Sequence, residues 1–228
     1  MAKRKGATTI VSRGSARPKR EAKTRRAPRA SSARAGAKGA PAPAPTGPVL
    51  TSTHREPLAH CRALIRDIPD FPTPGILFKD ITPLLADPRA FHIVLDQLAE
   101  RFIGEHIDAV VGIEARGFIF GGALAARLNA SFVPARKPGK LPGASDRVTF
   151  RTEYSSAALE MHKDSFPEES RVIIVDDVLA TGGTARAAAE LVRKQNGYVV
   201  AFAFVIELSF LNGRERLLPV KVESVMTY

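Results

Sequence analysis

The sequence predicts an α/β fold in which a central, mostly parallel sheet is flanked by helices, and two patterns support this. Short apolar runs rich in β-branched residues alternate with segments of helical periodicity, as in chains built from βαβ units. The strand-like runs are apolar at nearly every residue, which is typical of strands buried on both faces of a parallel sheet. The predicted strands are 109–113, 132–135, 171–175, 199–206 and 220–225. We expect ligands beyond their C-terminal ends, where such sheets bind them.

The segments before and between these strands carry helical patterns. Residues 117–128 are small and apolar, and residues 184–195 precede Gly197, which suits the end of a helix. Upstream, apolar side chains recur at helical spacing over 58–65 and over 90–103. These segments are the predicted helices that cover the sheet.

Two stretches are predicted as loops from their glycine and proline content. Residues 68–75 contain three prolines and one glycine, which exclude a regular helix. Residues 137–151 are polar and contain two prolines and two glycines. We therefore expect both stretches to be irregular.

The first 50 residues form a basic segment that differs from the rest of the chain. They hold 13 lysines and arginines but one acid, Glu21, and end in an Ala-Pro repeat at 40–45. Such a segment buries too little apolar surface to offset its ordering entropy, so residues 1–50 are predicted to be a disordered tail. The chain carries a net charge of +11, whereas residues 51–228 alone carry −1, so only the tail supports an interaction with nucleic acid. Three uses of the tail remain open: an organelle-targeting segment, a weak polyanion-binding tail and an inert extension.

The composition also indicates in which cellular compartment the protein is expected. The single cysteine, Cys61, allows no intrachain disulfide, and no apolar run reaches the roughly 20 residues that a membrane helix needs. The N-terminus lacks the apolar core of a secretory signal. We expect a cytoplasmic protein without membrane association, with organelle targeting by the tail left open.

The segment 172–184 joins two features that suit a ribose 5-phosphate. Four β-forming residues are followed by Asp176 and Asp177, so the strand delivers two carboxylates to the C-terminal edge of the sheet. Carboxylates at this position are suited to accept hydrogen bonds from a ribose diol. A helix is predicted to begin shortly afterwards, at Thr184.

Between the carboxylates and the helix lies a glycine-containing phosphate cradle. Gly182 and Gly183 have no Cβ, so their backbone N–H groups can approach an anion closely, while Thr181 and Thr184 add hydroxyl donors. The free N–H groups and positive dipole end of the helix face the same point. The segment is not a P-loop, since no lysine follows the glycines, and it lacks the dinucleotide-binding G-x-G-x-x-G pattern.

This segment resembles the phosphoribosyl diphosphate (PRPP) binding motif of the type I phosphoribosyltransferases, and three further segments narrow the resemblance to the adenine phosphoribosyltransferases. They are Phe71–Pro83 (FPTPGILFKDITP), Gly112–Gly121 (GIEARGFIFG) and Arg136–Gly143 (RKPGKLPG). The resemblance extends from about residue 60 to residue 228 and leaves out the basic tail.

The resemblance implies a purine salvage enzyme, a pentosyltransferase that converts adenine and PRPP to AMP and diphosphate with Mg²⁺. It implies a catalytic domain over residues 53–228, with a small N-terminal hood at about 53–85 and a flexible catalytic loop at about 137–152 that closes over the site and excludes water. Family members are commonly homodimers. We expect Mg²⁺ to be held mainly by substrate oxygens and water, with few protein carboxylates. The five histidines show no metal-ligand spacing and are assigned no role.

The resemblance also assigns the PRPP-binding residues. Residues 180–184 are expected to bind the 5′-phosphate; they are Ala180, Thr181, Gly182, Gly183 and Thr184. Asp176 and Asp177 are expected to bind the ribose hydroxyls. Four basic residues that follow two neighbouring predicted strands are expected to bind the diphosphate. They are Arg116, Arg136, Lys137 and Lys140. The family also suggests a cis peptide bond between Ala115 and Arg116.

The remaining assignments concern the base and the proton. Glu153, before Tyr154, is the candidate acid or base at adenine, and Arg116 joins it as a catalytic residue at the diphosphate. The family pattern has glycine after the tyrosine, whereas this chain has Ser155. Phe78 is expected to stack on the base, with backbone groups of Leu77 and Lys79 at its edge.

Two alternatives on the same fold remain open. The first is a phosphoribosyltransferase for another base, against which the Phe-Pro-Thr-Pro-Gly segment argues. The second is a PRPP-sensing regulator that binds nucleic acid through the basic tail.

Overall fold

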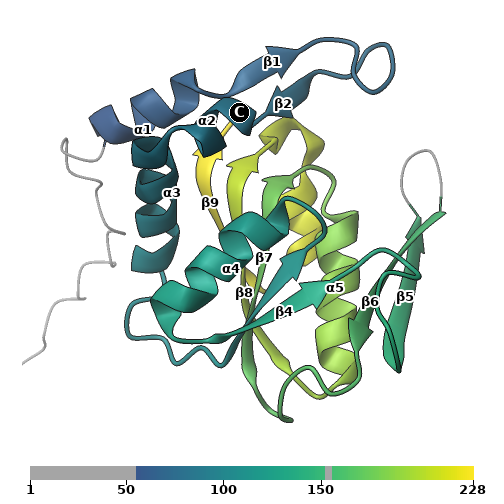
Figure 1. Ribbon diagram of the computed structural model, residues 1–228. Coiled ribbons are helices and arrows are strands. Elements are labelled where there is room, and N and C mark those ends of the chain that lie inside the picture. Colours follow the sequence, from purple (N-terminus) through teal and green to yellow (C-terminus); the bar gives the residue numbers. More distant parts are fainter. Residues whose placement is uncertain (1–54, 152–155) are drawn as a thin grey trace, which may run out of the picture. The chain divides into compact units, whose positions relative to one another are not determined.

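The computed structural model describes residues 55–151 and 156–228 (Figure 1). The predicted basic tail, residues 1–50, and the predicted catalytic Glu153 lie outside the described residues. No helix in these two ranges is both long and apolar enough to cross a membrane.

A five-stranded parallel sheet forms the centre of the domain, as predicted. Its order is β4 (Ser131–Ala135), β3 (Ala109–Ile113), β7 (Arg171–Leu179), β8 (Tyr198–Glu207) and β9 (Lys221–Thr227). Every neighbouring pair is parallel, so all five C-terminal ends lie at one edge of the sheet. Strand β7 is longer than its predicted range of 171–175 and carries Asp176 and Asp177 within the strand itself.

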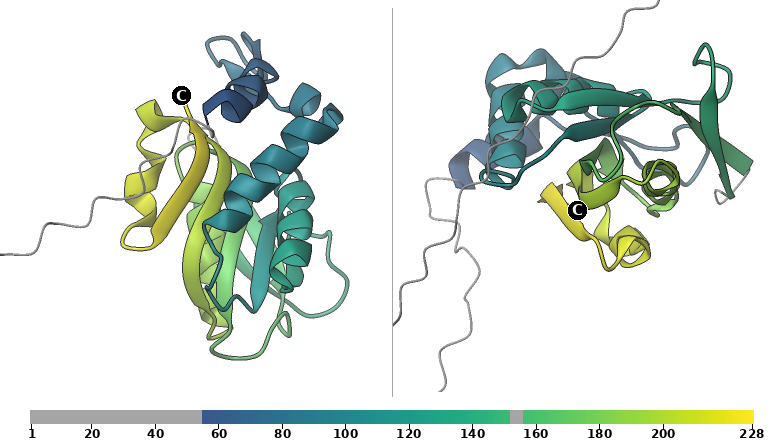
Figure 2. Two further views of the ribbon diagram at one scale, coloured as in Figure 1. Left: turned by 90° about the vertical axis from the view of Figure 1, so that its left-hand side faces the viewer. Right: turned by 90° about the horizontal axis from the view of Figure 1, so that it is seen from below.

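Helices cover both faces of the sheet (Figures 1 and 2). On one face, α3 (Pro88–Glu100) and α4 (Gly117–Leu128) pack on alternate strand residues such as Ile173 and Val175. On the other, α5 (Gly183–Lys194) packs on the intervening residues such as Ile174. This alternation explains why the strands are apolar at consecutive positions. Helix α3 begins two residues earlier than predicted, because the Asp87 carboxylate accepts a hydrogen bond from the Ala90 N–H at 2.8 Å and caps it.

The hood consists of α1 (Arg55–Ala63), β1 (Arg66–Ile68), β2 (Phe78–Asp80) and the short α2 (Thr82–Ala86). Strands β1 and β2 pair antiparallel and flank the proline-containing loop, which is irregular as predicted. The two strands were not predicted, because three residues are too few to show an alternating pattern.

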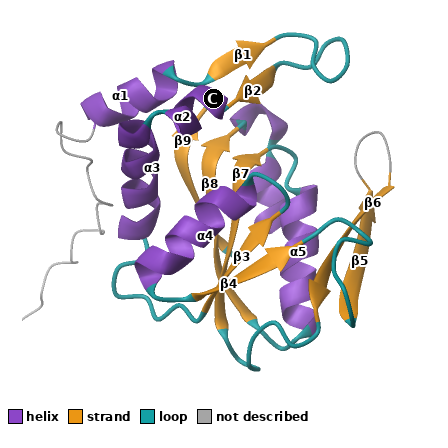
Figure 3. Cartoon of the chain, in the orientation of Figure 1, coloured by secondary structure: helices purple, strands orange, loops and turns teal. Residues whose placement is uncertain are grey.

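The prediction of a loop over 137–151 is wrong for its second half. Residues 145–151 form β5 (Ser145–Arg151), which pairs antiparallel with β6 (Ser156–His162), and Figure 3 shows this hairpin beside α5. The physical reason is tertiary: Val148 and Phe150 alternate along β5 and pack with α5 in one apolar cluster. The glycines and prolines that suggested a loop lie before β5, so the irregular part is 137–144.

The C-terminal region contains two short 3-10 helices between β8 and β9. They are η2 (Ser209–Leu211) and η3 (Gly213–Leu217). Because they follow the C-terminal end of β8, they lie at the edge of the sheet where a ligand is expected.

Candidate active site

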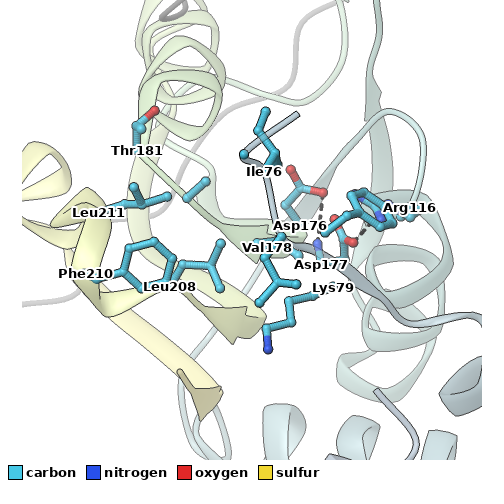
Figure 4. A pocket seen from close by; sticks show the side chains of 14 residues that line it. Ile76, Lys79, Arg116, Asp176, Asp177, Val178, Thr181, Leu208, Phe210 and Leu211 are labelled. Carbon is cyan, nitrogen blue, oxygen red and sulfur yellow. Dashed lines mark hydrogen bonds and ion pairs between the residues drawn. The ribbon is translucent and has the colours of Figure 1, made fainter. Parts of the chain in front are cut away.

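A cavity of about 640 Å³ lies at the C-terminal edge of the sheet (Figure 4). Three parts of the chain form its walls: the hood, the loops after β3 and β7, and the segment after β8. The lining residues are Gly75, Ile76, Leu77, Phe78, Lys79, Arg116, Asp176, Asp177, Val178, Ala180, Thr181, Leu208, Phe210 and Leu211. Eight of the fifteen residues predicted from the sequence are therefore brought together in one cavity.

The two aspartates form a tightly coupled, largely buried pair. The backbone N–H of Asp177 donates to Oδ1 of Asp176 at 2.9 Å, and the Asp177 residue is only 3% exposed. Burial raises the pKa of Asp176 well above its ordinary value of 3.8, and the neighbouring Asp177 carboxylate raises it further. Burial also raises the pKa of Asp177, although the Arg116 guanidinium opposes this shift. The site thus holds two carboxylates whose ionisation is made less favourable by burial.

Arg116 connects these carboxylates to the hood. Its Nε lies 2.9 Å from Oδ2 of Asp177, but the two groups are not aligned for a hydrogen bond, so this buried oxygen has no donor among the described residues. The guanidinium carbon lies 5.1 Å from the centroid of the Phe78 ring. Arg116 therefore borders both the carboxylate pair and the aromatic residue predicted to contact the base.

The backbone around Arg116 is closely packed against β7. Helix α4 begins at Gly117, where a Cβ would lie 2.7 Å from the Val175 carbonyl oxygen and 3.0 Å from Oδ1 of Asp176. Only glycine fits there without moving the aspartate pair. The cis peptide bond is Glu114–Ala115, so the prediction of one at Ala115–Arg116 is wrong by one residue. Local sequence did not specify which bond is cis.

The predicted phosphate cradle, residues 180–184, lies directly before and at the start of α5. A recess of about 70 Å³ opens beside the cavity and is lined by residues 180–184. Gly182 has φ +79°, a conformation that favours glycine, and no side chain caps the start of α5 that follows it. The N–H groups of the first turn of α5 are therefore left for an anion. The helix begins at Gly183, one residue before the predicted Thr184.

The segment after β8 forms a wall of the cavity that sequence reasoning missed. Leu208, Phe210 and Leu211 line it, and Phe210 is 69% exposed. Figure 4 shows these side chains on the side of the cavity away from Arg116. The rule that ligands bind beyond C-terminal strand ends could have identified them, since they follow β8 directly.

This segment contacts the phosphate cradle through two glycines. A Cβ on Gly213 would lie 2.0 Å from the Ala180 carbonyl oxygen and 3.0 Å from the Gly182 nitrogen. A Cβ on Gly182 would lie 2.6 Å from the Gly213 carbonyl oxygen. The apolar wall and the phosphate cradle are thus held together by close backbone packing that tolerates no side chain.

An ion pair between the exposed Arg214 and the buried Glu207 anchors the same segment. Arg214 donates from Nε to Oε1 of Glu207 at 2.9 Å and from Nη1 to the Val222 carbonyl oxygen at 2.6 Å. The Ser224 hydroxyl donates to Oε2 of Glu207 at 2.7 Å. The Arg214 hydrogen bonds lower the pKa of Glu207, so this carboxylate stays ionised. The network fixes residues 207–214 against β9.

The hood supplies the other apolar wall. The Phe78 ring contacts the Phe71 ring edge to face, with centroids 5.1 Å apart. Leu77 is 50% exposed and lines the cavity. The Lys79 ammonium bonds Oδ1 of Asp67 at 2.6 Å and lies 4.2 Å from the Tyr228 ring centroid. Its charge is thus engaged by Asp67 and by the Tyr228 ring.

Three predicted diphosphate residues, Arg136, Lys137 and Lys140, lie outside both hollows. Arg136 is paired with Glu114, with Nε and Nη2 each 3.3 Å from a carboxylate oxygen, and its Nη1 donates to the Lys140 carbonyl oxygen. The Lys137 N–H donates to the same Glu114 carboxylate at 2.8 Å. That hydrogen bond and the Arg136 contacts lower the pKa of Glu114. Glu114, which sequence reasoning did not assign, thus organises the basic loop.

Similarity to known proteins identifies the family to which this site belongs. The model of the phosphoribosyl transferase domain matches residues 84–226, which include the aspartate pair, the phosphate cradle and the segment after β8. An adenine phosphoribosyltransferase of Sorangium cellulosum is 70% identical over 168 residues, which are 74% of this chain and 83% of that protein. The chain belongs to the adenine phosphoribosyltransferase family.

Solved structures of adenine phosphoribosyltransferases share the fold. The Rhodothermus marinus structure matches with a TM-score of 0.73 at 48% identity and covers 76% of this chain and 99% of its own. The Saccharomyces cerevisiae structure, in complex with adenine and an imino-altritol bisphosphate, matches with a TM-score of 0.71 at 41% identity, covering 75% and 98%. The predicted family and its α/β fold are confirmed.

Proposed function

We propose that this chain transfers the 5-phosphoribosyl group of PRPP to N9 of adenine and releases AMP and diphosphate. The observation that carries the proposal is a single cavity in which a buried carboxylate pair and a phosphate cradle meet two apolar walls. The carboxylates and cradle suit a ribose 5-phosphate, and the walls suit the flat faces of a base. The adenine in the similar yeast structure supports the choice of base.

The PRPP half of the site follows from the chain's own groups. The N–H groups at the start of α5, with the hydroxyls of Thr181 and Thr184, suit the 5′-phosphate. Asp176 and Asp177 would accept hydrogen bonds from the ribose hydroxyls. This would supply a hydrogen-bond donor to Oδ2 of Asp177, which has none among the described residues. This gain offsets part of the cost of keeping the two carboxylates ionised.

The reaction exchanges one bond for another at C1′. The C1′–O bond breaks with its electron pair leaving on diphosphate, the N9 lone pair of adenine forms the new bond, and the N9 proton is lost. Positive charge develops on the ribose, where ionised Asp176 and Asp177 stabilise it. Negative charge develops on diphosphate, toward which we assign Arg116. Leu208 and Phe78 exclude water, which would otherwise hydrolyse PRPP.

The base lies between the hood and the segment after β8. Phe78 and Leu208 supply apolar surface for its faces, and backbone groups of Leu77 and Lys79 would read its edge. A backbone donor and acceptor suit the 6-amino group of adenine and disfavour a 6-oxo purine, in which donor and acceptor exchange places. This arrangement favours adenine over guanine, hypoxanthine and xanthine.

Mg²⁺ is proposed as the metal that accompanies PRPP. No group of three or more His, Cys, Asp or Glu side chains in residues 55–151 and 156–228 is arranged to hold a metal ion. The two cavity carboxylates, Asp176 and Asp177, are hard oxygen donors of the kind Mg²⁺ accepts through water, with substrate oxygens as its main ligands. When bound, the ion neutralises charge on the diphosphate.

Further assignments extend the same proposal. Arg136, Lys137 and Lys140 bind diphosphate once the Arg136 side chain is released from Glu114, and Glu153 takes the proton from N9. We also propose a homodimer, supported by Ile119 of α4 and Phe132 of edge strand β4, which are large apolar residues left exposed. Weak binding of polyanions by the basic tail is proposed from its charge alone.

The test is a panel of bases mixed with Mg²⁺ and PRPP, with nucleotide and diphosphate both quantified. We expect AMP and diphosphate in equal amounts with adenine and little product with guanine, hypoxanthine, xanthine or orotate. Glu153→Gln should lower mainly kcat. An inert reaction with adenine and turnover of another base would overturn the substrate assignment. PRPP binding without turnover of any base would favour a sensor.

A further inference from the structure

Tyr228 contacts the hood through its aromatic ring. The guanidinium carbon of Arg62, on α1, lies 4.4 Å from the ring centroid, and Nζ of Lys79, on β2, lies 4.2 Å from it. Both distances fall within the range of cation–π attraction. Arg62 also donates from Nη1 to the Thr227 carbonyl oxygen at 3.0 Å. Two elements of the hood are therefore attached to one residue beyond β9.

The backbone of Tyr228 is bonded to the opposite wall of the cavity. Its N–H donates to the Glu207 carbonyl oxygen at 2.9 Å. Its carbonyl oxygen accepts from the Ser209 N–H at 2.9 Å and from the Ser209 hydroxyl at 2.7 Å. Ser209 stands between Leu208 and Phe210, which line the cavity. Lys79 likewise follows Phe78 directly, so Tyr228 is one residue away from each wall.

The hydroxyl of Tyr228 is not the group that makes these contacts. It is buried and has no hydrogen-bond partner among the described residues. Burial raises the pKa of the phenol, although the nearby Arg62 guanidinium opposes this shift, so the hydroxyl is neutral. A buried hydroxyl without a partner costs stability, so it does not explain the position of this side chain. The ring explains this position, because it attracts both cations and packs against the apolar cluster under α3.

We propose that Tyr228 is a positioning residue that sets the spacing between the two apolar walls of the base site, and thereby the affinity for adenine. This inference rests on the proposed function. A flat base needs about 3.5–4.0 Å to the atoms on each of its faces, so a small change in wall spacing removes contact on one side. Tyr228 touches neither the aspartate pair nor the phosphate cradle through any contact described above, so PRPP binding should not depend on its ring.

The test compares Tyr228→Phe with Tyr228→Leu in the full chain, with steady-state kinetics varied in adenine and in PRPP separately. Tyr228→Phe keeps the ring and removes the unpaired hydroxyl, so both KM values should stay within about twofold of the wild type. Tyr228→Leu keeps an apolar side chain but removes the π-system. It should raise the KM for adenine about tenfold, the loss expected for two cation–ring contacts, and leave the KM for PRPP within about twofold.

A second variant guards against a folding defect in Tyr228→Leu. Arg62 is exposed on α1, so Arg62→Leu should fold normally and raise the KM for adenine about threefold by removing one cation. The inference is overturned if Tyr228→Leu and Arg62→Leu leave the KM for adenine unchanged, if both KM values rise together, or if Tyr228→Phe behaves like Tyr228→Leu. A wild type that turns over no base would instead refute the proposed function, so the two failures are distinguishable.

Discussion

Replacing Gly213 by alanine tests whether the segment after β8 holds the phosphate cradle in place. The new Cβ would lie 2.0 Å from the Ala180 carbonyl oxygen, whereas Cβ contacts below 3.0 Å essentially never occur. The two backbones must therefore separate by at least about 1 Å. Both sides are main chain, and Arg214 is anchored to Glu207, so the displacement falls largely on residues 180–182.

The magnitude follows from this displacement. Overpacking of this kind lowers the free energy of unfolding by about 1–3 kcal/mol. For a domain of this size, each kcal/mol lowers the Tm by about 2–4 °C. A 1 Å error in substrate position costs on the order of 10²-fold in rate. We expect Gly213→Ala to lower kcat/KM for PRPP by about 10²-fold, measured from diphosphate release at saturating adenine, with a lower Tm.

Gly122→Ala is the matched control. A Cβ on Gly122 meets no atom within 4 Å, and the residue lies inside α4, where alanine is favoured over glycine by about 1 kcal/mol. This variant should keep wild-type kinetics and a Tm at or above the wild-type value. Wild-type kinetics in Gly213→Ala would refute the coupling between the wall and the cradle.

Three further variants test the charged groups of the site. Asp176→Asn should raise the KM for PRPP about 10- to 100-fold by removing a charged acceptor, yet raise the Tm at pH 7. The pKa of this carboxylate is raised by burial, so wild-type stability should fall as pH increases from 3.8 through the raised value, and scanning calorimetry of the variant should lack that slope. Arg116→Gln leaves the Asp177 carboxylate buried without its cation, so the Tm of the variant should drop at pH 7. The Tm should recover toward the wild-type value as acid protonates Asp177. An unchanged Tm at pH 7 would argue against the pairing of Arg116 with Asp177. Arg214→Met removes the cation from Glu207, which then keeps only the Ser224 hydroxyl as a side-chain donor. This should cost about 2–3 kcal/mol in urea unfolding, less than for a fully buried pair because the Arg214 side chain is 44% exposed. The pKa of Glu207 is lowered, so the wild-type contribution is present above pH 4.5 and lost as pH falls through the lowered value, a dependence the variant should not show.

The features that could be predicted from the sequence are those whose parts lie close together in the chain. Strand, carboxylates, glycines and helix start follow one another within residues 172–184, so their spatial relation is set by one turn. Continuous apolar runs likewise predicted buried parallel strands. When helices cover both faces of a sheet, side chains on both faces are buried, so the strand sequence does not alternate between apolar and polar residues. Arg116 was located by the same logic, as a charged residue directly after β3.

Features made by contacts between distant segments could not be predicted in this way. Strand β5 depends on Val148 and Phe150 packing with α5, a contact that the preceding glycines and prolines obscured. The wall formed by Leu208, Phe210 and Leu211 has no local signature, because its role depends on facing the hood across the cavity. Gly213 reads as an ordinary turn glycine until the Ala180 carbonyl oxygen is placed beside it.

The sequence by itself therefore determined the sheet, the phosphate cradle, the two aspartates and the family, since each depends on local pattern or on resemblance. Only the tertiary structure decided which charges face the cavity. Arg136 was predicted to bind diphosphate, but Glu114 holds its side chain, and the Lys79 ammonium is held by Asp67. Charge at one position cannot reveal its partner, because an ion pair is a property of two side chains brought together by the fold.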